Sequence, residues 1–117
     1  MYITSMFSRE LIAASARPLL LSILAEGESY GYALAQRARA LSQEQVQWTD
    51  GMLYPVLHRL EEEELIASEW RESETGRERK YYSLTRGGRR ALAKEKEQWL
   101  AAHNTLVQLW KLPPVST

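Results

Sequence analysis

The side chains best able to do chemistry are cations gathered in one stretch of the chain. Residues 77–96 hold eight cations against two glutamates, a net charge of +6, whereas residues 61–74 hold seven glutamates against one arginine, a net charge of −6. The whole chain has a formal net charge of zero. Because a phosphate backbone responds to the local face and not to the sum, this segregation is compatible with nucleic-acid binding. Two ordinary solvated faces would explain the charges equally well.

The chain contains few residues suited to other kinds of functional site. The 117 residues include no cysteine and only two histidines, His58 and His103. We therefore expect no disulfide, no cysteine nucleophile and no histidine-based metal site. No glycine-rich phosphate loop follows a predicted strand, and no carboxylate pair falls in an apparent cleft. The sequence predicts neither an enzyme nor a cofactor.

The composition is that of one globular domain, with 44% hydrophobic and 26% charged residues. Residues 1–9 lack the basic start and apolar run of a signal peptide. No apolar run approaches the length of a membrane span. We expect a cytoplasmic protein without membrane association.

Apolar residues at helical spacing predict helices at residues 8–26, 30–41, 50–63 and 86–110. Pro18 either bends the first helix or opens a second one, and Gly27 is its expected stop. The second helix is predicted to bury Tyr30, Ala33, Leu34, Ala38 and Leu41.

Three polar residues are predicted N-caps of the last three helices, and two prolines are predicted to end the last one: Ser29, Thr49, Thr85, Pro113 and Pro114. Residues 42–48 read as a polar link between the second and third helices.

Between the third and last helices the period changes to two. Residues 66–71 and 80–84 alternate as strands do, and residues 72–78 contain Gly76 in a polar run that suits a hairpin loop. The order of elements predicts a mainly α fold with a small β-hairpin, a winged helix-turn-helix followed by a long C-terminal dimerisation helix. We divide the chain into a DNA-binding domain, residues 1–84, and a dimerisation helix with its tail, residues 85–117.

In such a fold the third helix enters the major groove of DNA and the hairpin lies on the neighbouring backbone. On this helix Thr49 lies at the positive helix end, and Met52 offers an apolar contact to a thymine methyl. Three further side chains offer hydrogen-bonding tips: Tyr54, His58 and Arg59. On the hairpin, Arg77, Arg79 and Lys80 can reach phosphates or a narrow minor groove. Simpler interpretations remain open, namely a solubilised hairpin tip, a solvated His58 and a packing role for Tyr54.

Two blocks of sequence carry a family resemblance. YGYAL at residues 30–34 precedes GMLYPVLHRLE at residues 51–61, and GRERKYYSLT at residues 76–85 follows Leu65 and Ile66. This combination resembles PadR-family transcriptional regulators over residues 19–99. The resemblance implies a repressor that binds a palindromic operator as a homodimer, in which the C-terminal helix makes the dimer.

The resemblance also assigns residues. Tyr32, Tyr54 and Pro55 match the helix-turn-helix signature, and the three cations of the hairpin match its wing. Met52 stands where the family usually has threonine, so a hydroxyl contact to DNA is lost. Glu64 stands where the family usually has glycine, which argues against the left-handed helix stop expected there.

The last helix carries an apolar stripe. Trp99 and Trp110 lie eleven residues apart, about 20° of rotation on a helix, and His103 and Leu106 fall on the Trp99 side. A small domain cannot cover such a stripe, which predicts a twofold dimer. Trp99 also lies near the tryptophan with which multidrug-sensing members of the family stack flat aromatic compounds. We hypothesise a small planar aromatic effector bound by Trp99 and Trp110; dry dimer packing is the alternative.

The residues therefore favour a DNA-binding transcriptional regulator. The alternative is a winged-helix module that binds protein without sequence-specific DNA binding. An affinity for DNA that falls steeply with salt would favour the first, because neutralised phosphates release counterions.

Overall fold

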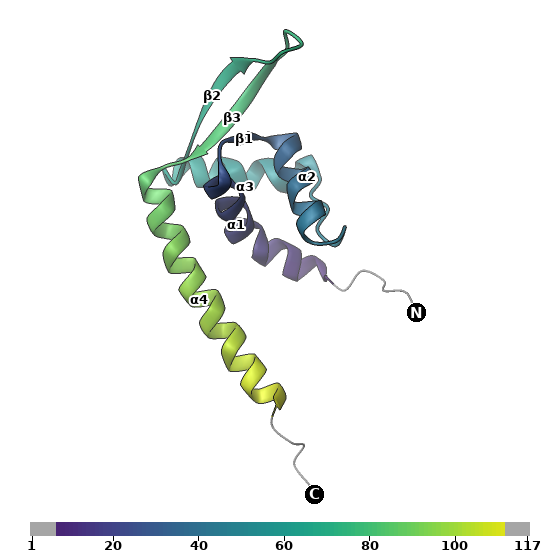
Figure 1. Ribbon diagram of the computed structural model, residues 1–117, viewed down its shortest axis with the longest axis vertical. Coiled ribbons are helices and arrows are strands. Elements are labelled where there is room, and N and C mark those ends of the chain that lie inside the picture. The colour runs from purple at the N-terminus through teal and green to yellow at the C-terminus, as the bar shows by residue number, and fades with distance from the viewer. Residues whose placement is uncertain (1–6, 112–117) are drawn as a thin grey trace, which may run out of the picture.

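Four helices and a three-stranded sheet make up residues 7–111, the part of the chain that the computed structural model describes (Figure 1). The elements are α1 (Arg9–Glu26), β1 (Ser29–Tyr30), α2 (Gly31–Leu41), α3 (Asp50–Glu62), β2 (Ile66–Glu72), β3 (Glu78–Leu84) and α4 (Arg86–Lys111). The predicted mainly α class is confirmed. The helix stop predicted at Pro113 and Pro114, and both ends of the predicted domains, lie outside the described residues. No helix within residues 7–111 is long and apolar enough to cross a membrane.

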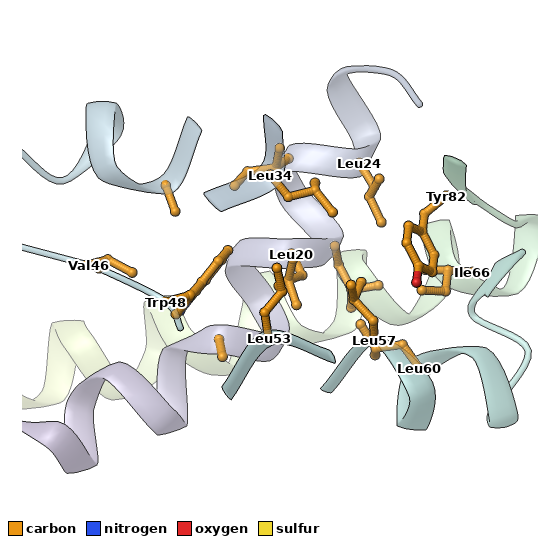
Figure 2. Close-up of a cluster of buried hydrophobic side chains, with 14 of the residues drawn as sticks. Leu20, Leu24, Leu34, Val46, Trp48, Leu53, Leu57, Leu60, Ile66 and Tyr82 are labelled. Carbon is orange, nitrogen blue, oxygen red and sulfur yellow. The ribbon is translucent and has the colours of Figure 1, made fainter. Parts of the chain in front are cut away.

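The core forms where α1 lies between α2, α3 and the sheet. Side chains of all these elements meet in one cluster (Figure 2), whose fully buried members include Leu20, Leu24, Leu34, Leu57, Leu60 and Ile66. The predicted apolar side of the third helix is confirmed, since Leu53 is buried with them and Val56 packs against the cluster. Burial of each such leucine contributes roughly 1.5–3 kcal/mol, so this cluster is what holds the three helices together.

The α1 helix is continuous. Pro18 lies inside it, so no second helix begins there, and the N–H of Gly27 bonds the carbonyl of Leu24 at the predicted stop.

The predicted polar link between α2 and α3 is wrong. Val46 and Trp48 are buried in the core, whereas Leu41, predicted to face inward, is 51% exposed. Gln43 and Glu44 adopt left-handed backbone angles, with φ of 53° and 69°. The hydroxyl of Ser42 accepts a hydrogen bond from the N–H of Val46 at 2.8 Å. This tight turn folds the chain back, which carries the two apolar side chains inward.

The predicted cap at Ser29 is also wrong. Ser29 and Tyr30 form β1, which pairs with β3 through the registers Ser29↔Tyr82 and Tyr30↔Tyr81. The helix begins one residue later than predicted, at Gly31. Strand pairing gives partners to backbone groups that a cap would have left to water. The Tyr30 and Tyr81 rings pack edge to face, with their ring centres 5.5 Å apart. The predicted hairpin is therefore part of a sheet with the order β1-β3-β2.

The α3 helix ends in the left-handed stop that the missing glycine argued against. Glu64 takes φ 62°. Its N–H bonds the carbonyl of Glu61 at 2.9 Å, and the N–H of Leu65 bonds that of Leu60 at 3.0 Å. These are the two bonds of a Schellman motif. The left-handed conformation costs a non-glycine residue about 1 kcal/mol, which the two bonds and the half-buried Leu65 offset.

The first turn of α4 is bound to that stop. Thr85 is the predicted N-cap, and its hydroxyl accepts from the N–H of Gly88 at 3.0 Å while donating to the carbonyl of Glu64 at 2.7 Å. Its N–H bonds the carbonyl of Leu65 at 3.0 Å. A Cβ at Gly88 would lie 2.1 Å from the Leu65 carbonyl oxygen. Only glycine allows this approach, so the turn after α3 sets where α4 begins.

One arginine joins three helices below this junction. The guanidinium of Arg17 on α1 bonds both carboxylate oxygens of Glu63, at 2.9 and 3.0 Å, and Glu95 of α4 at 2.8 Å. The hydrogen bonds from Arg17 hold the pKa of Glu63 below its ordinary value. The residue that ends α3 and a carboxylate of α4 thus bind the same cation on α1.

Two neighbouring glycines allow a test of the close approach. We expect Gly88→Ala to lower the free energy of unfolding by at least about 2 kcal/mol, because the methyl meets a backbone carbonyl that cannot rotate away. The midpoint of thermal unfolding should fall by roughly 10 °C.

The control is Gly87→Ala, whose Cβ would find its nearest neighbour at 3.7 Å. This variant should gain about 0.5 kcal/mol from the higher helix propensity of alanine. Equal effects of the two substitutions in calorimetry would contradict the proposed steric constraint.

Candidate nucleic-acid interface

A groove of about 700 Å³ lies between α3, the start of α2 and the hairpin of residues 66–84, which we call the wing. Six residues predicted to contact DNA line this groove: Tyr32, Tyr54, His58, Arg77, Arg79 and Lys80. They come from three separate elements. The fold thus places the hydrogen-bonding tips of α3 opposite the cations of the wing.

The other predicted contacts lie on α3 outside the groove walls. Thr49, Pro55 and Arg59 are exposed, and the Thr49 side chain makes no capping hydrogen bond although it occupies the N-cap position. Met52 is half-buried and packs against the core. Its methyl end is therefore less available to DNA than the sequence suggested.

Tyr54 reaches the groove because α2 begins with a glycine. A Cβ at Gly31 would lie 2.3 Å from the hydroxyl oxygen of Tyr54 and 3.0 Å from its ring carbon Cζ. The ring therefore rests directly against the backbone of α2 while its side chain stays 38% exposed. The packing interpretation of Tyr54 is therefore confirmed, and its exposure leaves the predicted DNA contact sterically possible.

Tyr32 stands at the first turn of α2 and is 68% exposed. The side-chain amide of Gln36 donates to its hydroxyl oxygen at 2.9 Å. Because that bond uses the oxygen as acceptor, the hydroxyl proton is left to donate to an acceptor such as a phosphate oxygen.

The three wing cations differ in how they are held. Lys80 lies 3.8 Å from a carboxylate oxygen of Glu61, and the guanidinium of Arg79 lies 4.3 Å from the ring centre of Tyr30. Arg77 is exposed and forms no ion pair with any residue that the structure describes. Glu78 is the one carboxylate among the groove walls. Arg77 is therefore the cation that can reach a phosphate at least cost.

The outer face of the wing is tied to β1 and to the residue before it. The guanidinium of Arg71 lies 4.9 Å from the ring centre of Tyr81 and bonds Glu28 at 2.7 Å. With the packing of Tyr30 against Tyr81, these contacts fix the direction of the wing relative to the helices. A two-stranded hairpin alone would be marginal in water.

Five residues that line the groove were not among the predicted contacts: Tyr30, Gly31, Trp70, Glu78 and Tyr82. Tyr82 is buried at its floor, and this burial raises the pKa of its hydroxyl. Trp70 is 64% exposed. The period of two already placed Trp70 on the same face as Ile66 and Ser68, which was the available signal. The position of the wing relative to α3 decides that this face turns toward the groove.

The residues of the predicted dimer and effector site lie elsewhere, on α4. Trp99, Leu106 and Trp110 are 42%, 45% and 70% exposed, and His103 is exposed with them. They continue the face on which Leu92 is buried, but the described part of α4 buries only Leu92 and Gly88. The wing and α4 diverge from one corner of the helical body, the wing toward the top and α4 toward the bottom of Figure 1.

Three helices with a wing behind the third, and a groove between them that gathers cations and polar tips, define a winged helix-turn-helix protein. Residues 20–94 match the family described as "Transcriptional regulator PadR-like family". Transcriptional regulator Rv3488 of Mycobacterium tuberculosis is 39% identical over 88 residues, covering 75% of this chain and 78% of that protein.

Solved structures agree with this match. A PadR family transcriptional regulator from Eggerthella lenta is 34% identical with a TM-score of 0.75, covering 89% of this chain and 88% of that one. A transcriptional regulator from Clostridium thermocellum is 28% identical with a TM-score of 0.79, covering 88% of this chain and 97% of that one. The chain belongs to the PadR-like family of transcriptional regulators, as its sequence blocks predicted.

The contact between Gly31 and Tyr54 can be tested by a double-mutant cycle. Gly31→Ala should lower the free energy of unfolding by about 1–3 kcal/mol, because the new methyl overlaps the Tyr54 hydroxyl. Tyr54→Phe removes that oxygen, so the pair of substitutions should cost clearly less than the sum. We expect a coupling of about 1 kcal/mol in urea unfolding.

Gly51→Ala serves as the control, since its Cβ would find only the Thr49 hydroxyl at 3.8 Å. Strict additivity of Gly31→Ala and Tyr54→Phe would show that the two residues are not in contact.

Proposed function

We propose that this chain is a repressor that binds a palindromic operator as a homodimer. The observation that carries the proposal is the groove, which unites wing cations and polar tips of α3 on one face. The alternative, a protein-binding module, shares the fold but has no need of unpaired cations beside a helix that offers hydrogen-bonding tips. We propose no enzymatic activity, and a DNA-binding regulator of this kind would act in the cytoplasm.

In the proposed complex α3 enters the major groove with its N-terminal half. Tyr54, His58 and Arg59 would meet base edges, and Thr49 would meet a phosphate at the positive helix end. The wing cations and the hydroxyl of Tyr32 would bind the phosphates on either side. Residues 1–84 would thus form the DNA-binding part of the chain.

The second half of the proposal concerns residues 85–117. The exposed apolar side chains of α4 extend the stripe that begins at the buried Leu92, and two copies would cover each other's stripe. A twofold arrangement would place the two copies of α3 about 34–36 Å apart, one turn of DNA. That spacing is why we propose a palindromic operator.

We further propose that a small planar aromatic compound regulates the dimer. Trp99 and Trp110 are the exposed aromatic residues of α4, and His103 and Leu106 share their face. Flat rings would stack between the copies of Trp99, at the site where the subunits meet. Dry packing of the same residues is the alternative outcome.

DNA binding is tested with sequences selected from a random pool by the purified protein. We expect a palindrome, and an affinity that falls steeply with rising salt. Arg77→Ala should weaken binding to all sequences alike and lower the salt slope by about 1. Lys94→Ala, an exposed lysine of α4 remote from the groove, is the matched control and should change neither.

No enrichment from the pool would overturn the proposal. Weak binding with a flat salt slope would favour the protein-binding alternative.

The effector proposal is tested by tryptophan fluorescence of the dimer. Planar aromatic compounds should quench the emission of the unmodified protein, and Trp99→Phe should abolish most of this quenching. Trp70→Phe is the control at the other end of the molecule and should leave it unchanged. Unchanged spectra on titration, with a Trp99→Ala variant that still sediments as a dimer, would assign the tryptophans to packing alone.

A further inference from the structure

We infer that Trp70 is the apolar contact of the wing with the DNA minor groove, and that it makes affinity depend on the base step beside each half-site. The inference rests on the proposed DNA binding. It adds a residue that reads DNA shape to the cations that bind phosphate.

The exposure of Trp70 is the first observation. Its side chain is 64% exposed on β2, and it makes no ring or cation–π contact with another described residue. Indole is the largest apolar side-chain group, so its exposure to water is unfavourable. Trp48, by contrast, is buried in the core.

The direction of Trp70 is the second observation. Every second residue of β2 lies on the same strand face, and the two such residues nearer the helices already have partners. Ile66 is in the core, and Ser68 donates to a carboxylate oxygen of Glu61 on α3 at 2.6 Å. Trp70 is the next member of this face, beyond the point where the wing leaves the helical body, and it lines the groove. It thus extends the row into the space that DNA would fill.

The charges beside Trp70 indicate what would cover it. Its partner across the strands is Lys80, whose ammonium group lies 5.7 Å from the ring centre of Tyr82. Arg77 and Arg79 line the same groove. An apolar ring among cations suits a partner that is anionic but has apolar surface between its charges. Deoxyribose and base edges between two phosphate backbones have this character.

A second copy of the chain is a poorer occupant. The tip of the wing and the end of α4 lie at opposite ends of the molecule (Figure 1), so a twofold contact through Trp99 and Trp110 of α4 would leave the wing uncovered. If a second copy covered the wing, the groove cations of the two copies would also face and repel each other.

Apolar side chains that enter the minor groove act on the base step that they touch. They pack on the sugars and partly unstack the step, which costs least at flexible pyrimidine–purine steps. Trp70 would therefore favour a TA or CA step where the wing crosses the minor groove, although it forms no hydrogen bond with a base.

The test uses the DNA selected by the unmodified protein, with the flanks of each half-site randomised again. Selection should enrich a flexible step at one flanking position. Trp70→Ala should weaken binding to the enriched flank about tenfold, a moderate value for the loss of an aromatic contact with nucleic acid. On a stiff flank the same substitution should cost less than about threefold, and Trp70→Phe should retain most of the preference.

Two controls distinguish a lost apolar contact from a lost charge or a loss of stability. The salt slope should not change in Trp70→Ala, because no charge is removed, whereas Arg77→Ala should lower it. The thermal midpoint should also change little, since Trp70 is already 64% exposed in the free protein. Addition of the selected DNA should change the tryptophan emission of the unmodified protein more than that of the Trp70→Phe variant.

The outcomes are distinct. If the unmodified protein binds selected DNA but Trp70→Ala keeps both its affinity and its flank preference, this inference is overturned and the proposed function stands. If the unmodified protein enriches no DNA, both are overturned.

Discussion

The first turn of α4 passes so close to the carbonyl of Leu65 that only glycine fits at residue 88. Around this contact the left-handed turn at Glu64 ends α3, Thr85 caps α4, and both strands of the wing begin or end. Four elements therefore take their directions from one short stretch of backbone. Because Thr85 is bonded to the carbonyl groups of Glu64 and Leu65, a shift of α4 must either break these bonds or move the end of α3.

This junction separates the wing from the long helix α4. On one side the wing extends over α3, where Tyr30, Tyr81 and Arg71 lock its angle and a cationic, aromatic groove results. On the other side α4 carries its apolar stripe away from the body. Arg17 bridges the end of α3 to Glu95 on α4, which couples the two sides through one cation. A ligand that moved α4 would thus act on α3 through packed and bonded groups and not over empty distance.

Local rules predicted most of the elements because they depend on near neighbours. The apolar period placed the helices and the period of two placed the wing. The N-cap position of Thr49, the side-chain cap at Thr85 and the stop at Gly27 depend on residues only a few positions away. The failures came where distant residues decide. Ser29 pairs with β3 instead of capping α2, and the carbonyl groups of the left-handed turn at Glu64 and Leu65 accept hydrogen bonds from Thr85 at the start of α4.

The sequence by itself determined the class of fold, the family and six residues of the groove, because these depend on periodicity and on side-chain types at short spacing. Only the tertiary structure decided that Trp48 is core, that Met52 turns partly inward, and that Trp70 and Tyr30 join the groove. The direction of each of these side chains depends on segments tens of residues away that no local pattern encodes. The cations were visible from the start as a charge excess; their meeting with the tips of α3 across a groove required the wing to be folded back over the helix.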